Sequence, residues 1–422
     1  MCRRNRAHDR WTLLRVGFAQ ERFETAYVIL VGMRVGLNAH LLSGRAGYRR
    51  AGIHSYISNL LRDLPSQAPP DWRFEAMVGA GNSAAFPGVS MSRARLDTEP
   101  PWRRIFWEQA LQPWQLRRHD LYHALAFVAP IVLTAPMVVT VFDLSFLHFP
   151  ARLSAARRLY LRAMTALTCA RARRVLAISQ STADDIMAHL RVPAGKIDVT
   201  PLGYDKAAFR PLLDADISHF RRKQGLPERF WLFVGTLEPR KNLPLLLKAY
   251  ARLGEDERLP LILGGGIGWM AQGVFAAIER LELGDWVKHA GFIPIADLPF
   301  WYNCAEAFLY PSVYEGFGLP VLEAMACGTP VITTNVSSLP EVAGGAAKCL
   351  PPSDIENWTA ALKDLKRDGE WRDLARARGL ERAQQFSWAR TAELTLKSYR
   401  KAIAARDLPL GDSEKVTQVE TK

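Results

Sequence analysis

Two glutamates eight positions apart, Glu315 and Glu323, stand on either side of a glycine-containing turn in residues 310–330 (YPSVYEGFGLPVLEAMACGTP). An ionised carboxylate only accepts hydrogen bonds, which suits it to neighbouring hydroxyl groups such as those of a sugar or a ribose. Both side chains lie near the expected start of a helix at Leu319, where the helix dipole favours the ionised form. We therefore expect two ionised carboxylates that hold a polyhydroxylated ligand. Helix capping alone is the alternative, although it needs neither the glycines nor a second glutamate.

The turn between the two glutamates has the features of an anion site. Gly316 and Gly318 let the backbone come close to a ligand, and Pro320 fits the first turn of the helix. The amides of Phe317, Gly318 and Leu319 then point outwards at the positive end of that helix. Because phosphate groups bind at such helix N-termini, we predict a diphosphate site here.

A second motif, FVGTLEPRKN (residues 233–242), adds two adjacent cations. Gly235 makes the turn after a predicted strand, and Arg240 and Lys241 come directly before a helix expected to begin near Leu243. The dipole of that helix repels cations at this end, so an anionic ligand explains the pair better than the helix does. A solvated pair on the surface is the alternative.

Candidate residues in the first half stand where a predicted strand ends or a predicted helix begins. They are Gly52, His123, Phe142, Asp143 and Ser179. Phe142 and Asp143 end a buried strand in VVTVFDLSFLHFP, where residues of a cleft belong, and Asp143 either binds ligand hydroxyls or caps the next helix. His123 ends another strand, although a lone histidine is more often structural. Gly52 fits a turn as well as a site, and Ser179 fits an N-cap as well as a site.

With these motifs in this order, residues 33–400 resemble the retaining glycosyltransferases of family 4, the group 1 type, which have the GT-B fold. The resemblance implies that Glu315 contacts the donor sugar and Glu323 contacts the ribose. It also implies that Arg240 and Lys241 neutralise the leaving diphosphate, and that the phosphate oxygen which leaves takes the proton of the acceptor. A nucleoside diphosphate sugar is then a co-substrate, and neither a cofactor nor a metal ion is expected.

The sequence departs from the family pattern at two positions. Family members commonly carry His-Asp where this chain has Phe142 and Asp143, with the histidine facing the donor sugar, so the rate or the sugar preference is in doubt. Some members carry Arg where this chain has Thr236, which implies a lighter phosphate clamp. The resemblance also places the amide of Gly52 near the donor phosphates or the acceptor, and the glycine run 264–268 beside the nucleotide base.

The alternation of short apolar runs with longer amphipathic stretches predicts parallel βαβ units. A chain of 422 residues is also too long for a single hydrophobic core, because chains longer than roughly 250 to 300 residues usually divide into more than one domain. We therefore predict two doubly wound, Rossmann-like α/β domains that face a central cleft, with a linker within residues 199–227. The predicted parts are an extension (1–32), an acceptor-side domain (33–205), a donor domain (206–385), a helix that packs back on the first domain (386–406) and a disordered tail (407–422).

Predicted strands of the first domain are residues 33–37, 73–78, 121–123, 137–141 and 174–178, and predicted helices are 53–64 and 155–169. In the second domain, the strand-like runs are WLFVGTL, PLILGGG, VKHAGFI, AFLYPS and PVITT. Ligands of open α/β sheets bind beyond the carboxyl ends of the strands, so the site is expected in the cleft.

The net charge of +13 is unevenly spread. Residues 33–210 hold 23 Lys and Arg against 12 Asp and Glu, whereas residues 211–422 hold 26 against 27. This asymmetry favours an anionic partner of the first domain: an anionic membrane surface, a lipid-linked phosphate or a nucleic acid. A generally arginine-rich surface is the alternative. Residues 101–118 (PWRRIFWEQALQPWQLRR) interleave Trp with Arg, which suits a membrane headgroup region. Contact with the acceptor and a plain surface are the alternatives, and RNA is less favoured because no nucleic-acid motif accompanies these residues.

The five cysteines are scattered and never form Cys-x-x-Cys, which argues against a disulfide framework and a zinc site and favours a reducing cytoplasm. The apolar stretch near the start is broken by Arg15 and Glu21, so a signal peptide is not expected and Met33 is expected to open the fold. No apolar run reaches the roughly 18 residues of a membrane span.

The predicted function is transfer of a hexose to a saccharide or lipid-linked saccharide in surface polysaccharide synthesis, on the inner face of the plasma membrane. GDP-mannose is the first donor to test, because GTLEPRKN and SSLPEVAGGAA resemble segments of mannosyltransferases, and UDP-glucose is the next. Two alternatives stay open. One is a nucleotide-sugar-binding protein that has lost transfer, suggested by Phe142, and the other is a nucleotide-sugar epimerase of the same fold.

Overall fold

The computed structural model describes residues 32–42 and 52–404. The predicted extension up to residue 31 and the predicted tail 407–422 therefore lie outside the described residues. The described residues belong to one contact unit, which begins at Gly32.

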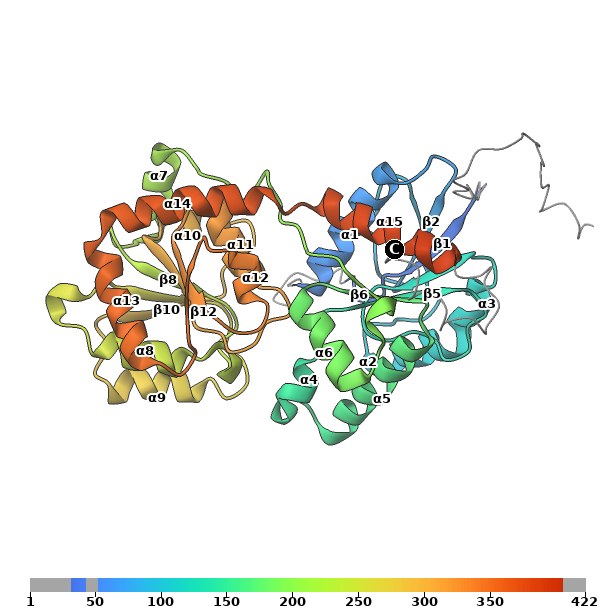
Figure 1. The fold of residues 1–422 in the computed structure, drawn as a ribbon, viewed down its shortest axis with the longest axis horizontal. Helices are drawn as coiled ribbons and strands as arrows, with labels where there is room; N and C mark the ends of the chain where they lie inside the picture. Colours follow the sequence, from blue (N-terminus) through green and yellow to red (C-terminus); the bar gives the residue numbers. More distant parts are fainter. Residues whose placement is uncertain (1–31, 43–51, 405–422) are drawn as a thin grey trace, which may run out of the picture. The chain divides into compact units, whose positions relative to one another are not determined.

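The first seven strands form one sheet in the order β3-β2-β1-β4-β5-β6-β7, and all neighbours in it are parallel (Figure 1). These strands are β1 (Arg34–Asn38), β2 (Arg73–Val78), β3 (Val89–Arg93), β4 (Leu121–Ala124), β5 (Met137–Val141), β6 (Arg174–Ala177) and β7 (Ile197–Val199). Every residue of β4 and β5 is buried. Continuous apolar runs of this kind are typical of central parallel strands that are covered on both faces.

Helices and short turns connect these strands. They are α1 (Ile53–Gln67), α2 (Pro101–Phe106), the π-helical turn η2 (Trp107–Leu111), α3 (Gln112–Leu116), α4 (Ser145–His148), the 3₁₀ turn η3 (Pro150–Arg152), α5 (Ala155–Arg171), α6 (Gln180–Leu190) and the 3₁₀ turn η4 (Ala194–Lys196). Two of them have side-chain caps, because Ser154 accepts from the amide of Arg157 and Ser179 accepts from the amide of Thr182.

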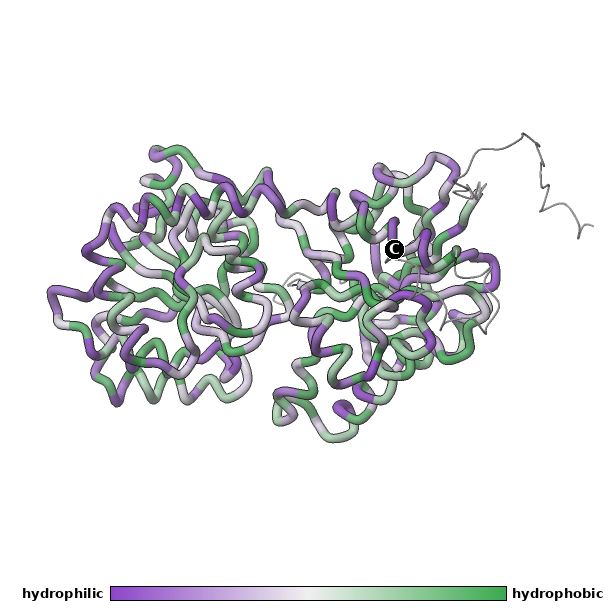
Figure 2. The backbone as a smooth tube through the Cα atoms, in the orientation of Figure 1, coloured by the Kyte–Doolittle hydropathy of each residue, from purple (hydrophilic) through white to green (hydrophobic). Residues whose placement is uncertain are grey.

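The remaining six strands form a second sheet in the order β10-β9-β8-β11-β12-β13, again all parallel. They are β8 (Trp231–Val234), β9 (Leu261–Gly264), β10 (Val287–Gly291), β11 (Ala307–Tyr310), β12 (Val331–Thr334) and β13 (Lys348–Leu350). In Figure 2 the hydrophobic residues follow the strands, while the surrounding helices alternate between hydrophobic and hydrophilic residues.

The helices of this second half are α7 (Asp214–Gln224), α8 (Leu243–Ala251), α9 (Gln272–Arg280), α10 (Leu298–Cys304), α11 (Leu319–Ala326), α12 (Leu339–Ala343), α13 (Ile355–Arg367) and α14 (Gly369–Gln384). Two 3₁₀ turns, η5 (Pro239–Lys241) and η6 (Glu255–Glu257), complete it.

The last described helix, α15 (Trp388–Ala404), packs against the first sheet and not the second. It contacts α1, β5 and β6. The hydroxyl of Tyr399 lies 2.7 Å from Nδ1 of His123 in β4, and Thr391 donates a hydrogen bond to the carbonyl of Pro201. The first sheet is thus covered by a helix that follows it by about two hundred positions in the sequence.

Two sheets of parallel strands, each joined by helices, confirm the predicted class of two doubly wound α/β domains. Strands β2 and β5 have the predicted bounds. Strands β3 and β7 were not predicted, since β3 is a partly exposed edge strand and β7 has three residues.

The stretch 199–227, within which the linker is predicted, contains α7 and is therefore not linker along its whole length. Only Phe220 of α7 is buried, so the helix has almost no apolar pattern to reveal it. Its acidic first turn and basic last turn suit the helix dipole.

Among the described residues, no helix combines the length and the apolar character that crossing a membrane requires.

Candidate active site

The two motifs expected to bind the donor meet at the carboxyl ends of β8 and β11. These strands are neighbours in the second sheet, so the residues that follow them lie side by side. Nζ of Lys241 donates to Oε1 of Glu315 at 2.6 Å, and a guanidinium nitrogen of Arg240 lies 2.7 Å from Oε2 of the same carboxylate. The other side of the Arg240 guanidinium pairs with Glu238 at 2.8 Å. Two cations and two carboxylates therefore form one network, the Arg240–Glu315 cluster.

Burial makes the charges of this cluster depend on each other. Only 9% of Glu315 and 5% of Lys241 are exposed. Burial alone raises the pKa of Glu315, but Arg240 and Lys241 outweigh it and lower the pKa to about 2. Burial and the neighbouring Arg240 lower the pKa of Lys241 to about 8, although Glu315 opposes this shift. Glu315 is thus firmly ionised, and Lys241 is mostly protonated at pH 7 but loses its proton at a lower pH than an ordinary lysine.

Hydroxyl groups fix the position of Glu315. Tyr310 and Ser312 both donate to its Oε1, and Ser337 accepts from its amide at 3.1 Å. Ser338 donates to the carbonyl oxygens of Glu315 and Phe317, at 2.9 and 2.8 Å. The turn that carries the carboxylate is therefore held by hydrogen bonds from β11, from its own residues and from the segment before α12.

Gly316 is required by a close approach within the protein. A Cβ atom at this position would lie 2.2 Å from the carbonyl oxygen of Phe142, which follows β5 in the first sheet. The hydroxyl of Thr182 in α6 lies between the two segments, 3.1 Å from the carbonyl oxygen of Phe142 and 3.2 Å from that of Gly316. The sequence predicts that this glycine admits a ligand; in the structure it admits the chain of the first half.

Gly318 is the N-cap of α11 and has a φ of 106°, which favours glycine. Leu319 and Pro320 form the first turn, as predicted from the sequence. Phe317 is buried and packs edge-on against Phe386. Gly235 makes the turn after β8, where its amide bonds to the carbonyl of Gly264 at 2.9 Å.

Glu323 differs from the expectation of an ionised carboxylate. Burial raises its pKa to about 8, and the hydrogen bond from Tyr302 offsets only part of this shift. Its position, in the second turn of α11, is too far from the helix start for the dipole to hold the charge. At neutral pH Glu323 is therefore largely protonated, and can donate as well as accept a hydrogen bond.

A cavity of about 610 Å³ lies at the carboxyl ends of strands from both sheets. Its lining includes Asp143 after β5, Thr236 and Glu238 after β8, and the glycine run after β9. The volume falls within the roughly 300 to 1,000 Å³ of small-molecule sites. Its remaining lining is Ile53, Ser145, Phe127, Phe146, Leu153, Arg157, Leu161, Ile267 and Trp269.

Phe142 and Asp143 both lie where β5 ends. The ring of Phe142 is buried and contacts the rings of Tyr56 and Phe127, with centroids 5.0 and 5.8 Å apart. Asp143 lines the cavity, and its Oδ1 accepts from the amide of Ser145 at 2.8 Å. Asp143 therefore lines the cavity and accepts from the first amide of α4, whose N-cap residue is Leu144.

His123 does not reach the cavity, contrary to our expectation of a cleft residue. It is fully buried, and its ring nitrogens lie 2.7 Å from the hydroxyl of Tyr399 and 2.8 Å from that of Thr140. Burial lowers the pKa of His123 to about 3, so it stays neutral. Both nitrogens are used inside the domain, which makes this histidine part of the contact with α15.

The remaining candidates of the first half are at helix starts. Ser179 is buried and caps α6, so the structure assigns it the N-cap role. Gly52 is exposed at the start of α1 with a φ of 42°, and the next residue, Ile53, lines the cavity.

Two residues of the candidate site were not named by the sequence analysis. Glu238 is the second carboxylate of the Arg240–Glu315 cluster, and its position two residues before Arg240 in EPRK was the available signal. Tyr314 donates to Asp185 in α6 at 2.7 Å and accepts from the amide of Leu144 at 2.9 Å. Nothing in the sequence pattern around Tyr314 indicates these long-range partners.

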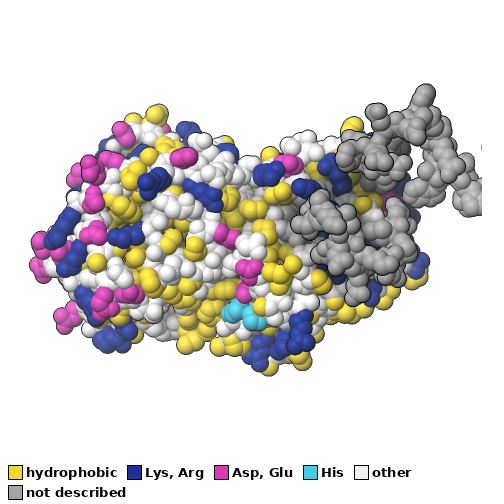
Figure 3. All heavy atoms as spheres, in the orientation of Figure 1, with side chains coloured by type: hydrophobic (Ala, Val, Ile, Leu, Met, Phe, Trp, Pro, Cys, Tyr) yellow, Lys and Arg dark blue, Asp and Glu magenta, His cyan; other side chains and the backbone are white. Residues whose placement is uncertain are grey.

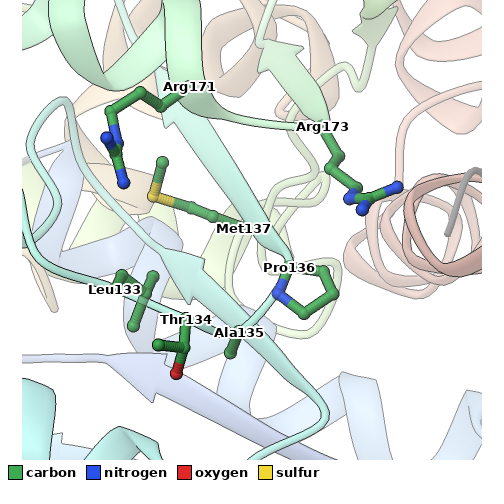
Figure 4. Close-up of a pocket in the computed structure, with 7 residues that line it drawn as sticks. All are labelled: Leu133, Thr134, Ala135, Pro136, Met137, Arg171 and Arg173. Atoms are coloured by element: carbon green, nitrogen blue, oxygen red, sulfur yellow. The ribbon is translucent and has the colours of Figure 1, made fainter. Parts of the chain in front are cut away.

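A smaller cavity of about 210 Å³ is a poorer candidate. Residues 133–137, Arg171 and Arg173 line it, so it lies at the amino ends of β5 and β6, away from the edge where α/β sheets bind ligands. In Figure 4 the guanidinium groups of Arg171 and Arg173 lie on opposite sides of Met137 and do not converge. The cavity therefore lacks a focused anion site.

Comparison with known proteins agrees with this arrangement. The family described as Glycosyl transferases group 1 matches residues 216–383, and the family described as Glycosyltransferase Family 4 matches residues 50–208. The chain belongs to the family 4, group 1 glycosyltransferases and has the GT-B fold.

Individual relatives extend this result. The O-antigen chain mannosyltransferase B of Escherichia coli is 36% identical over 294 residues, which cover 68% of this chain and 77% of the relative. Sucrose-phosphate synthase from Thermosynechococcus elongatus has a similar structure, with a TM-score of 0.72, 22% identity and coverage of 88% of this chain and 100% of the other. Anabaena HepE, in complex with UDP and glucose, gives a TM-score of 0.66 at 19% identity over 89% of this chain and 100% of its own. These two structures support the fold alone.

Proposed function

We propose that the enzyme transfers a hexose, with mannose the first candidate, from a nucleoside diphosphate sugar to a saccharide or lipid-linked saccharide acceptor, with retention of configuration. The observation that carries this proposal is the Arg240–Glu315 cluster, a buried pair of cations held by carboxylates beside a cavity of ligand size. The choice of mannose rests on the mannosyltransferase relative and on the GTLEPRKN and SSLPEVAGGAA segments. GDP is therefore the first nucleotide to test and UDP the second.

The charges of the cluster suit a diphosphate. Glu238 and Glu315 balance Arg240 and Lys241, so the site has no excess charge before the donor binds. The negative charge that develops on the leaving phosphate then meets two cations that are already oriented and shielded from water, which is electrostatic stabilisation by fixed donors. Because these cations take the role of neutralising that charge, the proposal needs no metal ion for transfer.

The residues then take separate roles. Glu315 accepts hydrogen bonds from the hexose hydroxyls, and the amides of Phe317, Gly318 and Leu319 bind phosphate. The leaving phosphate oxygen takes the proton of the acceptor hydroxyl, so no residue is required as a base. Glu323, neutral and half-buried in α11, is a hydrogen-bond partner for the ribose. Asp143, which faces the cavity from the first half, is the candidate for the acceptor or sugar hydroxyls.

We assign residues 33–205 to the acceptor side and residues 206–385 to the donor side. Phe142 fills the position that carries histidine in many relatives, and its ring is buried among Tyr56 and Phe127. An apolar ring there makes no hydrogen bond to the donor sugar. Recognition of the sugar then depends more heavily on Glu315 and the amides that follow it.

The acceptor side also carries a surface suited to an anionic membrane. Six large apolar side chains of η2, its flanking helices and the adjoining loop are exposed: Trp102, Phe106, Leu111, Trp114, Ile131 and Val132. Arg103 and Arg117 stack on two of these tryptophans, with centroid distances of 5.1 and 3.9 Å. Gln109 joins the helical segment to the loop through bonds to Ala129 and Ile131.

Exposed aromatic rings next to arginines match the interfacial region of a bilayer with acidic headgroups. We propose that this Trp102–Val132 surface holds the enzyme against the inner face of the plasma membrane, where a lipid-linked acceptor would be located. The four described cysteines are unpaired, which fits a reducing cytoplasm. No nucleic-acid partner is proposed.

The proposed activity is tested by incubating the purified chain with radiolabelled GDP-mannose, UDP-glucose or UDP-N-acetylglucosamine, with and without lipid-linked saccharides. Transfer, or slow release of the sugar to water, from one of the three donors is expected. Tight binding without either reaction would support the binding-protein alternative. Recovery of an isomeric sugar would support the epimerase alternative.

A further inference from the structure

Three potential metal ligands from separate parts of the first half meet at its surface. Nε2 of His148, the last residue of α4, lies 3.2 Å from Oδ2 of Asp185 in α6, and Nε2 of His189 lies 3.9 Å from Oδ1 of the same carboxylate. One ligand atom from each of the three residues lies within 4.8 Å of the other two. Figure 3 shows histidine side chains gathered beside acidic side chains at the surface. We call His148, Asp185 and His189 the two-histidine cluster.

The backbone explains why these side chains converge. Asp185 and His189 are four positions apart on α6, so they share one face of that helix. His148 reaches them from α4, and its ring stands edge-on to that of His189 with centroids 5.2 Å apart. The ring nitrogens, rather than the ring faces, are thus directed toward Asp185.

The spacing is close to that of a metal centre. Zinc–nitrogen bonds of about 2.0–2.1 Å and zinc–oxygen bonds of about 2.0–2.2 Å place tetrahedral ligand atoms about 3.3–3.5 Å apart. The two observed nitrogen–oxygen distances, 3.2 and 3.9 Å, bracket this value, and all three ligand atoms lie within 4.8 Å of one another, so the side chains must draw together to hold an ion. The side chains are 32%, 20% and 45% exposed, which leaves room for water as a fourth ligand.

We propose that the two-histidine cluster binds a divalent transition metal ion, with zinc as the first candidate. Two imidazoles and one carboxylate suit zinc and its first-row neighbours, and not calcium or magnesium, which prefer oxygen ligands. The site is separate from the Arg240–Glu315 cluster and takes no part in the chemistry proposed there.

The position of the cluster links it to the donor site. Tyr314 donates to Oδ2 of Asp185 at 2.7 Å, and its ring lies 4.7 Å from that of His148. The next residue along the chain is Glu315, which the proposed function places on the donor sugar. A metal ion that fixes Asp185 and His148 therefore also fixes one side of the donor-binding turn. This second step rests on the proposed function, whereas metal binding itself does not.

The first experiment measures metal binding alone. The full-length chain, freed of any affinity tag and dialysed against chelator, is titrated with Zn²⁺ by calorimetry and with Co²⁺ by visible absorbance. One equivalent is expected to bind, and loss of one ligand in His148→Ala or His189→Ala should weaken binding by about tenfold or more. His219→Ala, at an exposed position of α7, is the matched control and should bind as the native chain does.

The proposal is overturned if the His148→Ala/His189→Ala double variant, shown to be folded by circular dichroism, still binds one equivalent with native affinity. It is also overturned if the native chain takes up no stoichiometric metal. The second experiment measures GDP and UDP affinity with and without Zn²⁺. If Zn²⁺ changes the nucleotide affinity of the native chain, and this change disappears in the double variant and in Tyr314→Phe, the link between the metal site and the donor site is supported. If Zn²⁺ leaves the affinity unchanged, the link is overturned, but the metal site is not. Failure of both nucleotides to bind at all would count against the proposed function instead.

Discussion

Replacing Glu315 with glutamine separates charge from shape at the proposed donor site. Glutamine keeps one carbonyl oxygen for Lys241, Tyr310 and Ser312, but it removes the negative charge that faces Arg240 at 2.7 Å. Glu238 then remains as the carboxylate paired with Arg240. Because Glu315 opposes the lowering of the Lys241 pKa more strongly than Glu238 does, that pKa should fall below about 8 in the variant.

The size of the effect follows from these contacts. Removing one partner of a buried ion pair costs about 3–5 kcal/mol of folding free energy, and the lower end applies here because Glu238 and the amide oxygen of glutamine both remain. Loss of charged hydrogen bonds to the sugar in the transition state, about 2–4 kcal/mol, corresponds to a decrease in kcat/KM of about 30- to 1,000-fold. Affinity for GDP should change much less at a pH low enough for Lys241 to keep its proton, since both cations then still face the diphosphate.

The assay compares sugar release or transfer from the preferred donor, GDP binding by calorimetry, and urea unfolding. Glu356→Gln in α13 is the matched control, because Glu356 pairs with Arg252 on the exposed surface and its loss should leave all three measurements nearly unchanged. If Glu315→Gln retains kcat/KM within about threefold of the native enzyme while folded, the role assigned to Glu315 is refuted.

Three further predictions use other parts of the structure. Lys241 has a pKa lowered to about 8, so its charge is lost as the pH rises through that value, and GDP affinity should fall above pH 8. The Lys241→Arg variant should bind GDP with little change up to pH 10. Calorimetry at several pH values checks both results. Gly316→Ala should reduce donor turnover by about tenfold or more, since its Cβ would lie 2.2 Å from a backbone oxygen. Gly273→Ala in α9, where a Cβ meets open space, should leave turnover unchanged. Equal activity of the two variants would contradict the close approach at Gly316. Trp114→Ala should weaken sedimentation with vesicles rich in acidic phospholipid by about fivefold. Leu213→Ala, which removes a similarly exposed side chain in the second half, should leave sedimentation unchanged. Equal losses in both variants would argue against the proposed membrane surface.

The sequence predicted the elements whose signal is local. Continuous apolar runs such as residues 137–141 predict a buried strand. The glycines, prolines and paired cations that follow such runs identify the motifs proposed to bind the donor. Because Arg240 and Glu315 follow neighbouring strands of a parallel sheet, their proximity could also be expected. The alternation of strands and helices was enough for the fold class.

What the sequence could not supply depends on partners far along the chain. The neutral state of Glu323 comes from burial, which no local pattern reports. His123 looked like a cleft residue because Tyr399, which occupies one of its nitrogens, lies 276 positions away. The two-histidine cluster shows the same effect, since His148 is 37 positions from Asp185 and the expected metal-binding spacings are absent from the sequence.

Helix α15 sets an order for folding during synthesis. Tyr399 and Thr391 bond to groups of the first half, so the first sheet, whose strands lie within residues 34–199, lacks its covering helix α15 until residues 388–404 have left the ribosome. At about 5–20 residues per second, the two hundred residues between β7 and α15 take about 10–40 s to make. During that interval the buried imidazole of His123 lacks its partner and the faces of α1 and β5 that α15 covers are open to chaperones. In the part of the chain that the structure describes, the second sheet and its helices lie within residues 214–384, so this half should complete its fold first although it is made second.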